Sequence, residues 1–297
     1  MNPLRPGRTK QQHQGWFATY RWLLARRLSQ LTVLGIFLLG PLTGVWLVKG
    51  SMASSLTLET LPLTDPYLLL QSLAAGNIAE TTAFIGAAIV LAFYLLVGGR
   101  VYCSWVCPIN IVTDSAEWLR RRLGIKANRV KLNRAVRYWI LGLSLVLAAL
   151  TGSIVWELVN PVSLLFRGIV FGIGAAWLVI LGIFLFDLLL SHRGWCRHLC
   201  PVGAFYSLLG RVSPIRVGAL QRSRCDDCMD CFAVCPEPQV IKPALKGGPL
   251  DSPLILSGNC TNCAHCIDVC DKNVFSFTTR FSNKLNQDEI HQMEVMS

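Results

Sequence analysis

Four long apolar runs dominate the pattern of hydrophobic and polar positions along the chain. They cover residues 28–48, 81–98, 138–156 and 169–190. Each is close to the roughly 20 residues that an α-helix needs to cross a bilayer. The segment after the last run is of mixed polarity. The pattern therefore predicts an all-α membrane domain of four transmembrane helices, followed by a smaller domain outside the membrane.

Positive charges are placed unevenly between these runs. The chain of 297 residues is 53% hydrophobic, yet its formal net charge is +11. Six Lys and Arg residues precede the first run, nine lie in residues 99–137 and eleven in residues 191–297, whereas the two other connections hold one each. Cytoplasmic loops are enriched in Lys and Arg, so we expect a multi-pass protein of the bacterial inner membrane with both termini in the cytoplasm. This basic membrane surface explains the charge without a nucleic acid partner.

The membrane part contains an internal repeat. The sequence CSWVCP at 103–108 is answered 93 residues later by CRHLCP at 196–201, and each motif follows an apolar run. Asp-Pro at 65–66 in the first outer connection is answered by Asn-Pro at 160–161 in the second. Two spans return the chain to its starting side, so we expect two parallel two-helix repeats related by an axis along the membrane normal.

The repeated motifs carry two pairs of thiols at the predicted cytoplasmic membrane surface. Cysteines at i and i+4 of a helical turn lie on one face. Two such pairs around one axis could ligate a single iron or iron–sulfur centre, or act as two redox-active dithiols, or serve packing alone. The four residues concerned are Cys103, Cys107, Cys196 and Cys200.

Two further cysteine runs follow in the segment beyond the membrane part. Both have the spacing C-x2-C-x2-C-x3-C of bacterial ferredoxins, in which the fourth cysteine ligates the other cluster. Structural zinc sites usually combine two short motifs with two cysteines each, whereas each run here begins with three closely spaced cysteines. The spacing therefore disfavours zinc. We expect two [4Fe–4S] clusters, the first held by Cys225, Cys228, Cys231 and Cys270 and the second by Cys260, Cys263, Cys266 and Cys235.

These observations define the expected domains. Residues 1–27 form a basic cytoplasmic segment, 28–214 the four-helix membrane domain, 215–281 an α+β two-cluster ferredoxin-like domain, and 282–297 a flexible tail. The strings at 240–241, 254–256 and 274–278 are β-rich and predict strands of the small domain.

One acid lies within the fourth apolar run. Asp187 stands near its cytoplasmic end, in FLFDLLL. A carboxyl group in a membrane segment is costly. Asp187 is therefore either a functional group, such as a proton acceptor, or the partner of a structural salt bridge with Arg100 or a neighbour.

Together these motifs resemble the NapH family of integral membrane quinol dehydrogenase subunits in periplasmic nitrate reductase systems. The resemblance covers essentially the whole chain and includes GPLTGVW, PLTDP, CSWVCP, NPVSL, GWCRHLCPVGA and CMDCFAVCPEP. It implies oxidation of membrane quinol and electron transfer through iron–sulfur centres towards a periplasmic NapG-like partner. Nitrate reductase would be reached from there, directly or through a multihaem cytochrome.

Two other functions fit part of the same pattern. A related membrane ferredoxin could reduce metal ions or chelates, although a large additional periplasmic domain would be expected for it. A redox-sensing scaffold that docks a periplasmic reductase is the non-enzymatic alternative. An experiment that shows whether a quinol reduces the clusters would distinguish the quinol dehydrogenase function from both alternatives.

Overall fold

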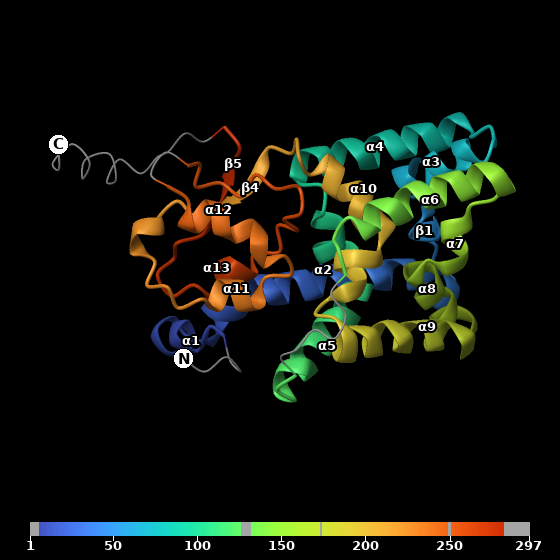
Figure 1. Cartoon of the computed structure of the whole chain (residues 1–297). Coiled ribbons are helices and arrows are strands. Elements are labelled where there is room, and N and C mark those ends of the chain that lie inside the picture. Colours follow the sequence, from blue (N-terminus) through green and yellow to red (C-terminus); the bar gives the residue numbers. More distant parts are fainter. Residues whose placement is uncertain (1–5, 126–131, 173, 249–250, 282–297) are drawn as a thin grey trace. The chain divides into compact units, whose positions relative to one another are not determined.

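The computed structural model describes residues 6–125, 132–172, 174–248 and 251–281 and divides the chain into two compact units (Figure 1). The first unit comprises Met1–Arg27, Leu95–Ser104 and Ser207–Ser297, and the second comprises Leu28–Tyr94 and Trp105–Tyr206. The expected tail at 282–297 lies outside the described residues.

Apolar helices form most of the second unit. Helix α2 (Trp16–Thr43) is the one helix of the described residues that is long and apolar enough to cross a membrane, and shorter apolar helices accompany it. These are α4 (Thr81–Val97), α6 (Val136–Thr151), α8 (Pro161–Phe171) and α9 (Gly174–Leu185), which continues as the π-helical turn η2 (Phe186–Leu190). Ile109, Val162 and Ile180 belong to the buried core of this unit.

The structure corrects three of the expected spans. The run at 28–48 stays helical only to Thr43, and Val48 enters a strand. The run at 138–156 ends at Thr151 because Gly152, at φ +65°, caps α6 with an N–H bond to Ala148 O. The run at 169–190 is divided, since its first residues close α8 before α9 begins.

The first outer connection holds a small sheet that the sequence analysis did not predict. Strands β1 (Val48–Gly50), β2 (Ser54–Thr57) and β3 (Leu61–Thr64) are antiparallel, with Val48 opposite Thr57 and Ser55 opposite Leu63. The strands are too short and too polar to show a clear alternation, which is why the pattern did not reveal them.

A short helix follows in each outer connection, and both begin in the same way. Asp65 caps α3 (Pro66–Ala74) by accepting the Tyr67 N–H at 3.0 Å, and Asn160 caps α8 by accepting the Val162 N–H at 3.1 Å. Proline follows the cap in both, where its missing N–H costs nothing. The repeated Asx-Pro pairs are therefore two equivalent helix starts.

The expected helical turn of each Cys-x3-Cys-Pro motif is a π-helical one. The turns are η1 (Tyr102–Val106) and η3 (Trp195–Leu199), and Cys200 N–H donates to Trp195 O at 3.0 Å, five residues back. The prolines then start new helices, α5 (Ile109–Arg122) and α10 (Pro201–Leu209). The same order of elements thus recurs in both halves, while the parallel arrangement of two repeats stays a prediction.

The first unit is built around short elements of the C-terminal segment. Its helices are α11 (Asp230–Val234), α12 (Ile241–Lys246) and α13 (His265–Val269), with 3-10 turns η4 (Arg222–Arg224) and η5 (Pro238–Val240). Strand β4 (Ile215–Gly218) pairs antiparallel with β5 (Ser276–Thr279). α1 (Arg8–Gln14) and the first part of α2 complete the unit.

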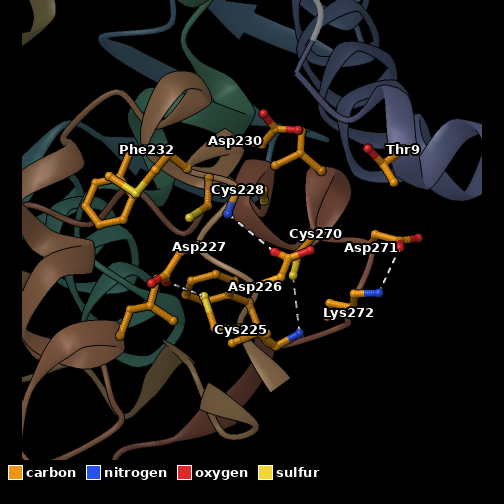
Figure 2. A pocket seen from close by; sticks show the side chains of 16 residues that line it. Thr9, Cys225, Asp226, Asp227, Cys228, Asp230, Phe232, Cys270, Asp271 and Lys272 are labelled. Atoms are coloured by element: carbon orange, nitrogen blue, oxygen red, sulfur yellow. Dashed lines mark hydrogen bonds and ion pairs between the residues drawn. The ribbon is translucent and has the colours of Figure 1, made fainter. Parts of the chain in front are cut away.

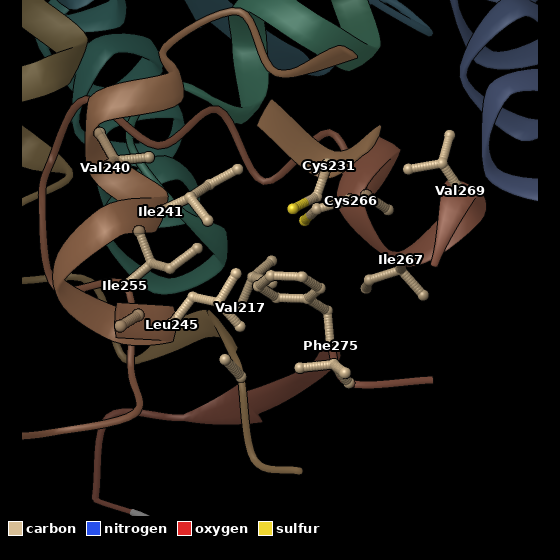
Figure 3. Packing of buried hydrophobic residues seen from close by; sticks show 14 of the residues in the cluster. Val217, Cys231, Val240, Ile241, Leu245, Ile255, Cys266, Ile267, Val269 and Phe275 are labelled. Carbon is tan, nitrogen blue, oxygen red and sulfur yellow. The ribbon is translucent and has the colours of Figure 1, made fainter. Parts of the chain in front are cut away.

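Of the three strings expected as strands here, only the last contributes to one. Val240 and Ile241 are helical and lie with Ala244 and Leu245 in the buried core (Figure 3). Their spacing of one, four and five residues suits one face of a helix, which outweighs their β propensity. The string at 254–256 makes only an isolated bridge, between Leu254 and Gly218.

Candidate functional site

The two cysteine runs of the first unit form loops with the same backbone. Residues at matching positions, 35 apart, adopt the left-handed conformation, namely Asp227 and Met229 in one loop and Asn262 and Ala264 in the other. Each left-handed Met229 or Ala264 immediately precedes a five-residue helix, α11 or α13. Non-glycine residues rarely adopt this conformation, and successive N–H groups arranged in this way form concavities for anionic groups, including iron–sulfur clusters.

The first expected set of cysteines lines a single pocket (Figure 2). Cys225, Cys228 and Cys231 come from one loop, and Cys270 comes from the end of the other run. Phe232 and Leu245 line its apolar side, and Thr9 of α1 also contributes. The structure thus brings the four expected ligands of the first cluster together across 45 residues of sequence.

The second set is gathered more deeply. Cys235 and Cys266 lie close enough to Cys260 and Cys263 to interact electrostatically with both. Cys266 also lies beside Cys231 of the first set (Figure 3). Two four-cysteine groups therefore adjoin each other inside one small core.

The donor set fits iron–sulfur clusters. All twelve cysteines of the chain are free thiols. Burial raises the pKa of Cys231 to about 12 and that of Cys260 to about 11, so these thiols become ligands only when a cation replaces the proton. Across the described ranges no three His, Cys, Asp or Glu side chains are grouped to hold a single metal ion. Two four-thiol groups with the ferredoxin spacing suit cubanes better than zinc.

The N-terminal segment, expected only as a basic tail, is anchored on helix α13. Lys10 Nζ donates to Ile267 O at 2.8 Å, and Asp268 accepts the backbone N–H groups of Trp22 at 3.3 Å and Leu23 at 3.0 Å. Burial raises the pKa of Asp268 to about 6. Because Asp268 lies between two expected ligands, this contact fixes the helix that carries them.

Sequence reasoning also missed the buried ion pair of Arg100 and Glu237. Arg100 is not the partner of Asp187 that the sequence suggests, because it pairs with Glu237 at 3.0 Å within the first unit. The sequence does place both charges beside cysteine motifs. Arg100 stands three residues before Cys103, and Glu237 stands two residues after Cys235.

Asp187 is buried in the second unit, with 1% of its surface exposed. Its Oδ1 accepts the Trp195 N–H at 2.9 Å, at the start of the second cysteine turn. Arg120 donates to the main-chain oxygens of Asp187 and Leu188, both at 3.1 Å. The acid therefore connects η2 with the turn that carries Cys196 and Cys200.

The Cys-x3-Cys-Pro thiols are half-buried. Cys107 packs against the core of the second unit, and Cys200 lies close enough to Tyr67 to interact electrostatically with it. Among the described residues, no group of three His, Cys, Asp or Glu side chains that could hold one metal ion is found at these pairs. Whether the two pairs form one site stays a prediction.

Comparison with known proteins gives two regions of one family and several long relatives. The family described as "4Fe-4S binding domain" matches residues 80–126 and 173–219, and the second match starts 93 residues after the first. Both matches contain a Cys-x3-Cys-Pro motif. No solved structure matches the chain significantly.

The relatives match over nearly their full length. The ferredoxin-type protein NapH of Haemophilus influenzae is 48% identical, over 95% of this chain and 98% of its own. NapH of Escherichia coli is 49% identical over 93% and 96%. The methylamine utilization ferredoxin-type protein MauN of Methylorubrum extorquens is 54% identical over 90% and 92%.

The paired cysteine loops and these matches define a ferredoxin-type electron transport protein with 4Fe–4S domains. The chain belongs to the family of NapH and MauN ferredoxin-type proteins. The resemblance to NapH found in the sequence is confirmed, and MauN proteins are relatives of the same degree.

Proposed function

We propose that the protein is a membrane electron-transfer subunit that oxidises quinol. It passes the electrons through iron–sulfur clusters towards a periplasmic iron–sulfur partner. The observation that carries this proposal is the pair of adjoining four-cysteine groups in a chain whose other unit consists of apolar helices. Adjoining redox centres suit transfer of one electron at a time.

Each cluster would be held by three cysteines of one loop and the fourth cysteine of the other run. Cys225, Cys228, Cys231 and Cys270 hold the first cluster, and Cys260, Cys263, Cys266 and Cys235 hold the second. When bound, these clusters supply one-electron acceptance and donation at adjacent positions.

Buried apolar residues surround the inner thiols of both groups. Val217, Ile241 and Val274 are almost fully buried in the core on which the cysteines pack. The core keeps Cys231 and Cys266 away from solvent, while Cys225 and Cys228 stay partly exposed in the first group. We infer that the first group lies nearer the surface at which an electron partner would approach.

The second unit would lie in the bacterial inner membrane, with four spans and cytoplasmic termini. Its helices expose large apolar side chains, among them Phe93 on α4, Leu150 on α6 and Leu178 on α9. Such exposure is what lipid contact requires and is unusual for a surface in water. The placement of Lys and Arg supports the orientation.

Asp187 would accept a proton released during quinol oxidation. Its burial and its bond to the second cysteine turn support this assignment. A further iron–sulfur centre at Cys103, Cys107, Cys196 and Cys200 is favoured by the family matches, which cover both pairs.

The final electron acceptor would be a nitrate reductase, reached through a NapG-like partner and, where present, a multihaem cytochrome. The identity to MauN makes a route connected with methylamine utilization the second candidate. Both routes use the same cysteine groups and differ only in the partner.

Anaerobic protein in lipid nanodiscs, mixed with a quinol analogue, tests the function. Appearance of the EPR signal of reduced clusters supports it, with an oxidised quinone as the control. Clusters that dithionite reduces but quinol does not, with or without the periplasmic partner, would contradict it.

A further inference from the structure

Arg100 and Glu237 form a fully enclosed ion pair in the first unit. Arg100 Nη1 lies 3.0 Å from Glu237 Oε1, and each side chain is only 2% exposed. The same nitrogen donates to Asn259 O at 2.9 Å. An isolated buried pair gains little stability, because removing two charges from water offsets their attraction. Its position therefore needs another explanation.

The pair joins three segments that carry cysteines. Glu237 stands two residues after Cys235, Asn259 immediately precedes Cys260, and Arg100 stands three residues before Cys103. One guanidinium thus holds both ends of the second cysteine group and the start of the first Cys-x3-Cys motif.

Other contacts strengthen the same junction. Ser104 Oγ donates to Thr261 O at 2.7 Å, and both residues are buried. Asn262 Nδ2 donates to Ile215 O at 3.2 Å and to Val97 O at 3.5 Å. The segment from 97 to 104 is therefore fastened to the loop of the second group along its length.

The charges of the pair act on that group. Arg216 and Arg100 lie close enough to Cys260 to interact with it electrostatically. Glu237 lies close enough to Cys235 to do the same. Reduction of a thiolate-bound cluster adds one negative charge. A nearby cation stabilises the added charge and an anion destabilises it, most strongly where water is excluded.

We propose that Arg100 is a positioning residue that fixes the second cysteine group against the Cys103 segment. Its positive charge raises the reduction potential of the cluster bound there, and Glu237 lowers it. The inference rests on the proposed function only in taking this group as a cluster site.

Redox titration of the full-length protein, followed by EPR, tests the proposal. Arg100→Gln should shift one of the two reduction steps to lower potential, and Glu237→Gln should shift the same step to higher potential. Arg100→Lys, which keeps the charge, should restore most of the wild-type value. The other step should stay in place. Lys242→Gln removes one positive charge from an exposed position on α12 and should move neither step, because solvent screens it.

Shifts of equal sign in the two Gln variants, or no shift, would overturn the electrostatic part. Iron and sulfide are measured in each variant. If both variants lose iron, loss confined to the second group supports the positioning role, and equal loss from both groups overturns it. A wild-type protein without any reducible cluster would instead contradict the proposed function.

Discussion

Cys231 and Cys266 lie side by side in the core of the first unit, although 35 residues separate them (Figure 3). They are neighbours because Cys231 lies on α11 and Cys266 lies on α13, and these two helices pack against each other. Each belongs to a different four-cysteine group. The contact therefore brings the two groups next to one another and gives the short separation that successive electron transfer needs.

The anchor of α2 on α13 should be stabilising. Asp268→Ala removes the acceptor of the Trp22 and Leu23 N–H groups and should cost about 2 kcal/mol of unfolding free energy. Hydrogen exchange of residues 16–27 should become faster. Asp251→Ala, which removes the exposed acceptor of the Gly248 N–H, should leave that exchange unchanged. Equal exchange in both variants would contradict the anchor.

Gly98 should be irreplaceable where the chain enters the first Cys-x3-Cys motif. Its φ is +134°, and a Cβ there would lie 2.6 Å from Asn262 Nδ2 and 2.9 Å from Val101 Cγ2. Gly98→Ala should cost at least about 2 kcal/mol and lower the iron content of the second group. Gly142→Ala, in open space on α6, is the matched control and should fold with full iron content. An unaffected Gly98→Ala protein would refute the close packing.

Asp65 should make stability depend on pH. Burial raises the pKa of Asp65 to about 6, well above the usual value of about 3.9 for an aspartate. The folded state therefore holds this proton more tightly than the unfolded state, so stability is lost as pH rises from about 4 through 6, by up to about 3 kcal/mol. Asp65→Asn keeps the helix cap and should unfold at a higher temperature than wild type at pH 8, but at the same temperature at pH 4.

The other half of the chain supplies the control for this substitution. Asn160 already caps α8 with an amide, and its Nδ2 donates to Glu157 at 3.2 Å. Asn160→Asp should therefore lower stability above pH 6, through repulsion between two carboxylates. Parallel behaviour of Asp65→Asn and Asn160→Asp at pH 8 would show that the Asp65 charge is not the cause.

The membrane topology has its own test. A reporter fused after Ser51 or at Arg167 should be exposed to the periplasm, and one after Gly124 or at the C-terminus to the cytoplasm. The C-terminal reporter is the critical one. A periplasmic result there would overturn the assignment of all cysteines to the reducing side.

Spacing in the sequence was enough to predict the two cysteine groups, because ferredoxin runs fix which thiols share a loop. The helix starts at Asp65 and Asn160 were visible as a repeat for the same local reason. The Arg100–Glu237 pair could not be predicted, since it depends on how segments 137 residues apart fold together.

The errors at span ends have a related cause. Hydropathy does not distinguish a continuous apolar helix from two that are divided by a left-handed glycine such as Gly152. Val240 and Ile241 show the converse, because burial on one helix face replaced the strand that their branched side chains favour.

The central claim is that each cluster takes ligands from both cysteine runs. The most direct test is to measure which cluster is lost when a single ligand is replaced. Anaerobic wild-type protein should show two [4Fe–4S] clusters from the C-terminal cysteines in Mössbauer and EPR spectra. Cys270→Ser should damage the cluster of Cys225, Cys228 and Cys231 and spare the other, and Cys235→Ser should do the reverse. Damage by Cys270→Ser to the cluster of Cys260, Cys263 and Cys266 alone would contradict the account.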